Sequence, residues 1–259
     1  MLFVEGIILT LFYPLFALVF GALVSIIVNY FLETKQKNLI KGKFASKVSP
    51  QVMEDIMKRA ADKGNTFIAK EHEITVTFSD IRNFTNISEV AGGARLLIQF
   101  LNEYMDEMTQ IIMKYEGTVD KFIGDAIMAI FGTPFPHEDD EDRALRCACT
   151  MMAELNVFNA DRAAKDKLPV DMGIGVNTGH VVSGNIGSPK RMDYTVIGDG
   201  VNLAARLESA CKQYGSNLLV SAGTVDRLRG TYRTREIDRV VVKGKTEPVG
   251  VYEVLDFHT

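Results

Sequence analysis

The longest apolar segment of the chain lies at its beginning. Residues Gly6 to Leu32 carry no charged side chain and are rich in Leu, Ile, Val and Phe. A run of this length spans a bilayer, so we predict a transmembrane segment within residues 1–32. Pro14 divides the run, which fits either one helix or a short helix, a turn and a spanning helix from Leu15. A cleavable signal peptide fits poorly because no basic region precedes the run and no small-residue cleavage site follows it.

The segment after Leu32 is polar and basic. An excess of lysine next to a spanning run marks the cytoplasmic side, which places the rest of the chain in the cytoplasm. A solvated linker also explains these lysines. Ser49-Pro50 then opens a predicted amphipathic helix, and we expect residues 33–70 to form a helical linker that pairs with a second chain or packs on its own domain. The lysines are Lys35, Lys37, Lys41, Lys43 and Lys47.

Strict alternation of apolar and polar residues predicts a strand from Glu73 to Ile81. Residues 118–123 and 126–131 also predict strands, and they meet at Gly124-Asp125, a pair typical of a tight hairpin turn. Helical periodicity extends over residues 88–115 and 138–163, and a further strand is predicted over residues 170–177. This βαββαβ order is the ferredoxin-like plan of an α+β domain.

The C-terminal part is predicted to extend this domain, which we place at residues 71–259. It adds a strand that ends at Gly187, a strand over residues 193–197, a helix from Gly198 and a strand pair at residues 232–242 and 249–254.

Composition narrows the classes of function. The 259 residues are 47% apolar with a net charge of -4, which permits one sizeable domain plus an appendage and gives no basic excess for nucleic acid. Three cysteines without metal-ligand spacing suggest a reducing compartment, and four scattered histidines give no zinc site.

One carboxylate stands on an apolar strand face. Asp80 continues the row of Ile74, Val76 and Phe78, where a lone carboxylate is costly unless a cation or hydrogen-bond donors meet it. Its neighbours Arg82 and Asn83 are candidate partners. In the ferredoxin-like plan, however, the first strand lies near the hairpin turn that carries Asp125. The two acids can therefore converge on a divalent cation whose other ligands come from substrate phosphates.

Three motifs follow one another along the chain. They are Phe78-Ser79-Asp80-Ile81-Arg82-Asn83-Phe84-Thr85, Lys121-Phe122-Ile123-Gly124-Asp125 and the run Tyr-Thr-Val-Ile-Gly-Asp-Gly-Val-Asn-Leu-Ala-Ala-Arg from Tyr194 to Arg206. In this order and spacing they resemble the class III nucleotidyl cyclase catalytic domain of bacterial membrane-anchored adenylate cyclases. The resemblance covers roughly Glu71 to Asp256 and implies conversion of ATP to 3′,5′-cyclic AMP and pyrophosphate by attack of the ribose 3′-hydroxyl on the α-phosphate.

The resemblance implies a two-metal site. Asp80, Asp125 and the backbone carbonyl of Ile81 match the ligands of two Mg²⁺ or Mn²⁺ ions per active site, which activate the 3′-hydroxyl and neutralise the leaving pyrophosphate. The backbone amides of Phe84 and Thr85 match positions that hold the β- and γ-phosphates.

Four further residues match roles at the ribose, the α-phosphate and the base. Asn202 matches the residue that orients the ribose, and Arg206 matches the arginine that stabilises charge developing on the α-phosphoryl group. Lys121 can donate to adenine N1, and Thr195, where many adenylate cyclases carry aspartate, can accept from the adenine amino group. Guanylate cyclases of the family use glutamate and cysteine there, so we expect ATP rather than GTP.

One position departs from the family pattern. Many relatives carry a triphosphate-contacting arginine at the position of Gly173. Lys245 matches another phosphate-contacting lysine and is one replacement, and Arg191 is a weaker one. Both also fit ordinary surface charge.

The family architecture further implies a homodimer, with the aspartates from one chain and the base, ribose and α-phosphate residues from the other. Together with the apolar start, this predicts an enzyme of the bacterial inner membrane with its catalytic domain in the cytoplasm. The alternatives are a catalytically silent cyclase-like module, a guanylate cyclase, a membrane-anchored adaptor and a diguanylate cyclase. Loss of a metal aspartate or of Arg206 would favour the silent module. A Gly-Gly-Asp/Glu-Glu-Phe hairpin would favour the diguanylate cyclase.

Overall fold

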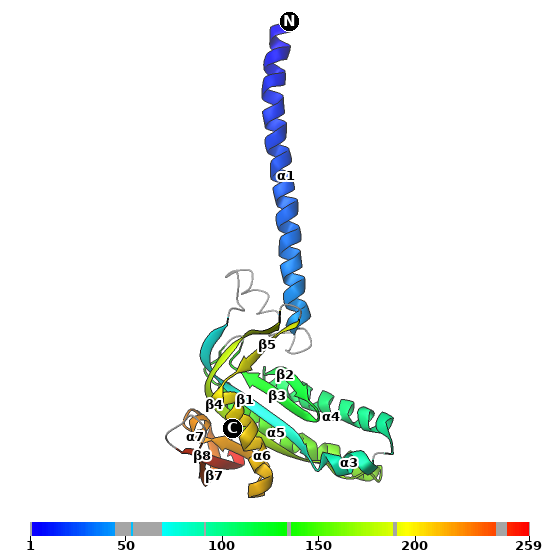
Figure 1. Ribbon diagram of the computed structural model, residues 1–259, viewed down its shortest axis with the longest axis vertical. Helices are drawn as coiled ribbons and strands as arrows, with labels where there is room; N and C mark the ends of the chain where they lie inside the picture. Colours follow the sequence, from blue (N-terminus) through cyan, green and yellow to red (C-terminus); the bar gives the residue numbers. More distant parts are fainter. Residues whose placement is uncertain are drawn as a thin grey trace. The chain divides into compact units, whose positions relative to one another are not determined.

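The computed structural model describes residues 2–44, 53, 69–90, 92–133, 136–188, 191–241 and 248–258 (Figure 1). The chain separates into two compact units, Met1–Ser46 and Lys47–Thr259. The first unit is the helix α1 (Leu2–Phe44), which continues through Pro14, so the single-helix alternative holds there. Within α1, Tyr13–Leu32 is long and apolar enough to cross a membrane, with a mean hydropathy of 2.4. The predicted helix after Ser49-Pro50 lies outside the described residues, apart from Met53.

The second unit is built on an eight-stranded sheet in its described residues, with the order β2-β3-β1-β4-β6-β8-β7 and with β5 paired to β4. The strand β1 lies between β3 and β4 and is antiparallel to both, as in the predicted ferredoxin-like plan. The α+β fold is thus confirmed. The strands are β1 (Lys70–Arg82), β2 (Thr118–Ile123), β3 (Ala126–Phe131), β4 (Asp171–Ser188), β5 (Arg191–Ile197), β6 (Leu218–Ser221), β7 (Thr231–Val240) and β8 (Val249–His258).

Helices cover both faces of this sheet. On one face, α4 and α5 bury large apolar side chains such as Tyr104, Met108 and Leu145 against β1, β3 and β4. On the other face, α6 packs Leu203 and Ala204 against the sheet. The helices of this unit are α3 (Phe84–Val90), α4 (Ala94–Lys114), α5 (Asp140–Ala164), α6 (Asp199–Tyr214) and α7 (Ala222–Val225).

Burial on both faces changes the interpretation of the first strand. Thr75, Thr77 and Ser79, which alternate with the apolar row, are buried too, because α4 and α5 cover their side. The central position of β1 explains this, since a strand with neighbours on both edges and helices on both faces has no solvated side.

Two predicted elements differ in the structure. The helix expected over residues 88–115 is divided into α3 and α4, because Gly92 and Gly93 adopt positive φ angles of 74° and 119° that end one helix before the next begins. The strands expected before and after Thr178-Gly179-His180 form one strand, β4, whose residues 178–180 pair with residues 73–75 of β1. The short elements β6 and α7 were not predicted.

Candidate active site

The structure brings Asp80 and Asp125 together near the end of β1. The register pairs Ser79 with Ile127, which sets Asp80 beside the β2–β3 turn, where Gly124 has a φ of 67°. The two carboxyl groups lie next to each other, and Asp80 Oδ1 accepts a hydrogen bond from the Ile81 amide at 3.0 Å. Burial, and then the negative charge of Asp125, raise the pKa of Asp80 to about 7. The predicted convergence of the two acids is therefore present.

A third carboxylate, which the sequence analysis missed, approaches from α6. Glu208 adds negative charge next to Asp80 and Asp125. Burial raises the pKa of Glu208, while a hydrogen bond from Ser209 and the positive charge of Arg82 act in the opposite direction. Glu208 lies four residues after Ala204, on the helix face that packs on the sheet, and this spacing is the signal that would have found it.

The donor set suits a hard divalent cation. Asp80, Asp125 and the carbonyl of Ile81 offer only oxygen atoms, and two adjacent carboxylates gain most from a cation between them. In the described part of the chain no three His, Cys, Asp or Glu side chains are grouped to hold an ion alone. Such a partial set is what Mg²⁺ or Mn²⁺ uses when substrate phosphates complete its coordination, so the residues fit the predicted ions.

The position of Gly173 is explained by close packing of α6. Gly173 pairs with Asp80, and a Cβ there would lie 3.1 Å from the Cβ of Cys211 and 3.2 Å from Glu208 Oε1. At Gly175 a Cβ would lie 2.3 Å from the backbone nitrogen of Glu208. A longer side chain at residue 173 therefore requires Glu208 to move. Of the two proposed replacements for the missing charge, Lys245 lies outside the described residues, as does the side chain of Arg191.

Lys121 and Thr195 come together around a residue that was not predicted as part of the site. Asp120 is only 2% exposed, and its Oδ2 accepts a hydrogen bond from Thr195 Oγ1 at 2.7 Å. The Nζ atom of Lys121 lies 3.3 Å from the same oxygen. The β2–β3 register shifts between Val119 and Lys121, so a bulge at Asp120 turns its side chain inward. An aspartate directly before the predicted Lys121, in the middle of a strand, was the available signal.

The remaining predicted residues lie on two helices. Asn202 and Arg206 are exposed on α6. Since successive helical residues differ by about 100°, Arg206 lies about 200° from Glu208 and projects away from the carboxylates of its own chain. Phe84 and Thr85 form the start of α3, immediately after Asn83 with its φ of 54°, where the first helical amides have no intrahelical acceptor.

Comparison with known proteins identifies the family of this domain. Residues 68–254 match the family described as the Adenylate and Guanylate cyclase catalytic domain. An adenylate cyclase of Anabaena cylindrica is 38% identical over 225 residues, which cover 84% of this chain and 42% of that protein. The chain thus spans less than half the length of this relative.

Solved structures of both substrate classes are similar to the chain. The adenylyl cyclase CyaB from P. aeruginosa has 37% identity and a TM-score of 0.67, and the match covers 73% of this chain and 96% of that one. The guanylyl cyclase Cya2 has 35% identity and a TM-score of 0.64, with 73% and 95% covered.

Proposed function

Because the chain belongs to the adenylate and guanylate cyclase catalytic-domain family, we propose that it converts ATP to 3′,5′-cyclic AMP and pyrophosphate. The observation that carries this proposal is the close approach of the Asp80 and Asp125 carboxyl groups at the end of a central strand. A silent cyclase-like module has no need to keep two uncompensated carboxylates in contact, since such a pair costs stability unless a cation joins it.

In this proposal Asp80, Asp125 and the carbonyl of Ile81 hold two Mg²⁺ or Mn²⁺ ions. When bound, the ions supply Lewis-acid activation of the ribose 3′-hydroxyl and neutralise charge on the triphosphate. The amides of Phe84 and Thr85 position the β- and γ-phosphates, because the first amides of a helix point outward as free donors.

Base selection rests on the hydrogen bond between Thr195 and Asp120. Since the Thr195 hydroxyl donates its hydrogen bond to Asp120, its lone pairs are left to accept, and Lys121 can only donate. Adenine offers an acceptor at N1 and a donor at its amino group, which match this pair. Guanine offers a donor at N1 and an acceptor at O6, which mismatch both. The arrangement therefore supports ATP as the substrate.

The orientation of α6 supports a homodimer with shared sites. Asn202 and Arg206 point away from the carboxylates of their own chain, so they serve the pair of a second copy, where Asn202 orients the ribose and Arg206 stabilises the α-phosphoryl charge. Large apolar side chains are exposed at Phe122 and Ile123 of β2 and at Ile197 of β5. Such surfaces are typical of protein interfaces.

The apolar helix supports membrane attachment. We infer that Tyr13–Leu32 anchors the chain in a lipid bilayer, and that the lysines after it keep the catalytic unit on the cytoplasmic side, as at a bacterial inner membrane.

A substrate assay on the full chain in detergent tests the proposal. We expect cyclic AMP to form from ATP in the presence of Mn²⁺, with kcat/KM for ATP at least about tenfold above that for GTP, the value of one mismatched hydrogen bond. Mass spectrometry of the products distinguishes the two cyclic nucleotides. A preference for GTP would make the chain a guanylate cyclase, and no product from either nucleotide would support the silent module.

A further inference from the structure

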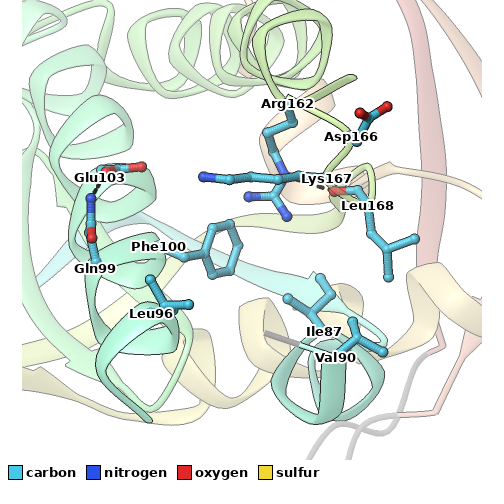
Figure 2. A pocket seen from close by; sticks show the side chains of 10 residues that line it. All are labelled: Ile87, Val90, Leu96, Gln99, Phe100, Glu103, Arg162, Asp166, Lys167 and Leu168. Carbon is cyan, nitrogen blue, oxygen red and sulfur yellow. Dashed lines mark hydrogen bonds between the residues drawn. The ribbon is translucent and has the colours of Figure 1, made fainter. Parts of the chain in front are cut away.

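A cavity of about 290 Å³ lies between α3, α4 and the segment that joins α5 to β4 (Figure 2). Its apolar wall consists of Ile87, Val90, Leu96 and Leu168. The cavity holds on the order of ten non-hydrogen atoms, if each takes ~30 Å³. None of the residues of the proposed nucleotide site lines it.

One side of this cavity is formed by a buried cation. Arg162 is 7% exposed, and its guanidinium lies 4.5 Å from the centre of the Phe100 ring and 5.8 Å from that of Phe158. Figure 2 shows the guanidinium beside the Phe100 ring, among the residues that line the cavity. The stack holds the planar group in one orientation.

The hydrogen-bonding capacity of Arg162 is only partly used. Its Nε donates to the carbonyl of Leu168 at 2.7 Å. Among the described residues neither of its Nη groups has a hydrogen-bond acceptor or a carboxylate in ion-pair contact. The side chain is buried overall, but its Nη atoms are not among the fully buried polar atoms that lack a partner in the described chain. They open to the cavity that Arg162 lines, where an added acceptor can bind them.

Two acids limit the kind of ligand. Glu103 and Asp166 line the cavity together with Arg162 and Lys167, so the charged side chains sum to zero. Glu103 is held by Gln99, whose Nε2 donates to Glu103 Oε1 at 2.9 Å. A single negative charge placed at Arg162 is favourable, whereas a dianion such as phosphate brings a second charge toward the two acids.

We propose that this cavity binds a small monocarboxylate with an apolar body. The carboxylate accepts hydrogen bonds from both Nη groups of Arg162, and planar bidentate pairing of this kind is the strongest contact that arginine makes. The hydrocarbon part lies against Ile87, Val90 and Leu168, where burial supplies most of the affinity.

Fluorine NMR with 4-fluorophenylacetate tests this site on the full chain in detergent, without nucleotide. We expect the fluorine signal of the probe to broaden when the protein is added. An excess of phenylacetate, which carries no fluorine, should reverse this broadening. Phenylacetamide, which has the same shape without the charge, and inorganic phosphate should compete at least about tenfold more weakly, the value of one charge-assisted bidentate contact.

Three variants separate the site from nonspecific binding. Arg162→Lys keeps the charge but loses the planar fork, and should weaken binding by about tenfold. Leu96→Trp fills the cavity from a residue that is 53% exposed, so it should abolish binding without unfolding the chain. Its matched control is Ile98→Trp on the same helix, 58% exposed and outside the cavity, which should bind as the wild type does.

Equal competition by phenylacetamide, or unchanged binding in Leu96→Trp, would overturn the proposal and leave Arg162 as a purely structural cation. The same holds if the wild-type chain does not broaden the probe. Because no nucleotide is present, each of these results leaves the proposed cyclase activity untouched.

Discussion

Two parts of this domain each hold a carboxylate away from bulk solvent, Asp120 buried and Asp80 half-buried, but they balance its charge differently. Asp120 is matched within its own chain, by the Thr195 hydroxyl at 2.7 Å and the Lys121 ammonium at 3.3 Å. Asp80 instead meets a second acid, Asp125, and its pKa rises to about 7. The half proposed to read the base therefore has its charge matched as folded, whereas the proposed carboxylate half becomes balanced only when a cation is added.

Neutralising the carboxylate half should have the largest effect on activity. Asp80→Asn and Asp125→Asn each remove a proposed ligand, and we expect cyclic AMP formation with Mn²⁺ to fall by about 10²–10³-fold, the size of losing one preorganised charge-stabilising group. Asp106→Asn on α4 is the control, because this exposed residue contacts only Gln110 among the hydrogen bonds of the described chain. Substantial activity in either site variant would remove the metal assignment.

Co-expression of a variant that lacks the carboxylate pair with a variant that lacks Arg206 tests whether one active site takes these residues from two chains. Asp80→Ala and Arg206→Ala should both be inactive alone. Co-expressed, half of the randomly assembled dimers contain one intact site out of two, so we expect recovery of about a quarter of wild-type activity. Activity that stays at the level of the single variants would show that one chain supplies its whole site.

A change at Asp120 should alter the selectivity for ATP over GTP more than it alters the rate of cyclisation. In Asp120→Asn the amide can donate to Thr195, which frees the threonine proton for guanine O6. We expect the ratio of kcat/KM for ATP to that for GTP to fall by about tenfold, equal to one hydrogen bond. Thr133→Val is the matched control, since it removes a 2.8 Å hydrogen bond to the adjacent Tyr194 and should leave the ratio unchanged.

A change at Glu208 should have a smaller effect on activity, because Glu208 adds negative charge next to Asp80 and Asp125 but is not a proposed metal ligand. Glu208→Gln should raise the Mn²⁺ concentration for half-maximal activity by about threefold, because one nearby charge in a half-exposed setting is worth less than ~1 kcal/mol. The maximal rate should change little. Asp161→Asn, which removes an exposed partner of Lys165 on α5, serves as the control. A large loss of maximal rate would make Glu208 a ligand instead.

The smallest expected effect is that of Asp80 protonation on the stability of the folded chain. Between its ordinary pKa of 3.8 and about 7, Asp80 holds more proton in the folded than in the unfolded chain. The free energy of unfolding should therefore fall as pH rises through this window. In EDTA, we expect the melting temperature of the wild type to decrease more between about pH 5 and pH 8 than that of Asp80→Asn. Mn²⁺ should remove the difference between the two. Parallel melting curves without metal would contradict the raised pKa.

The sequence predicted the parts of this fold that depend on local pattern. Alternation located β1, and Gly124-Asp125 located the hairpin, because both signals act within a few residues. The division between α3 and α4 was not predicted, although Gly92-Gly93 marks it, because the apolar periodicity continues across the break.

The site was predictable only as far as the motifs reach. Glu208 and Asp120 were missed because each becomes important through a neighbour from another element: Glu208 through Asp125, and Asp120 through Thr195. Such contacts depend on how α6 packs over Gly175 and how β5 approaches β2, and no short pattern records either.

The two sides of α6 have a consequence for how the chain works in a cell. Glu208 faces inward and Arg206 outward, so in the proposed homodimer a solitary copy would hold an incomplete catalytic site. Output would then grow with the square of copy number at low abundance, and confinement to a two-dimensional surface would concentrate the copies without any change in their structure. In that proposed homodimer, dilution alone would abolish activity.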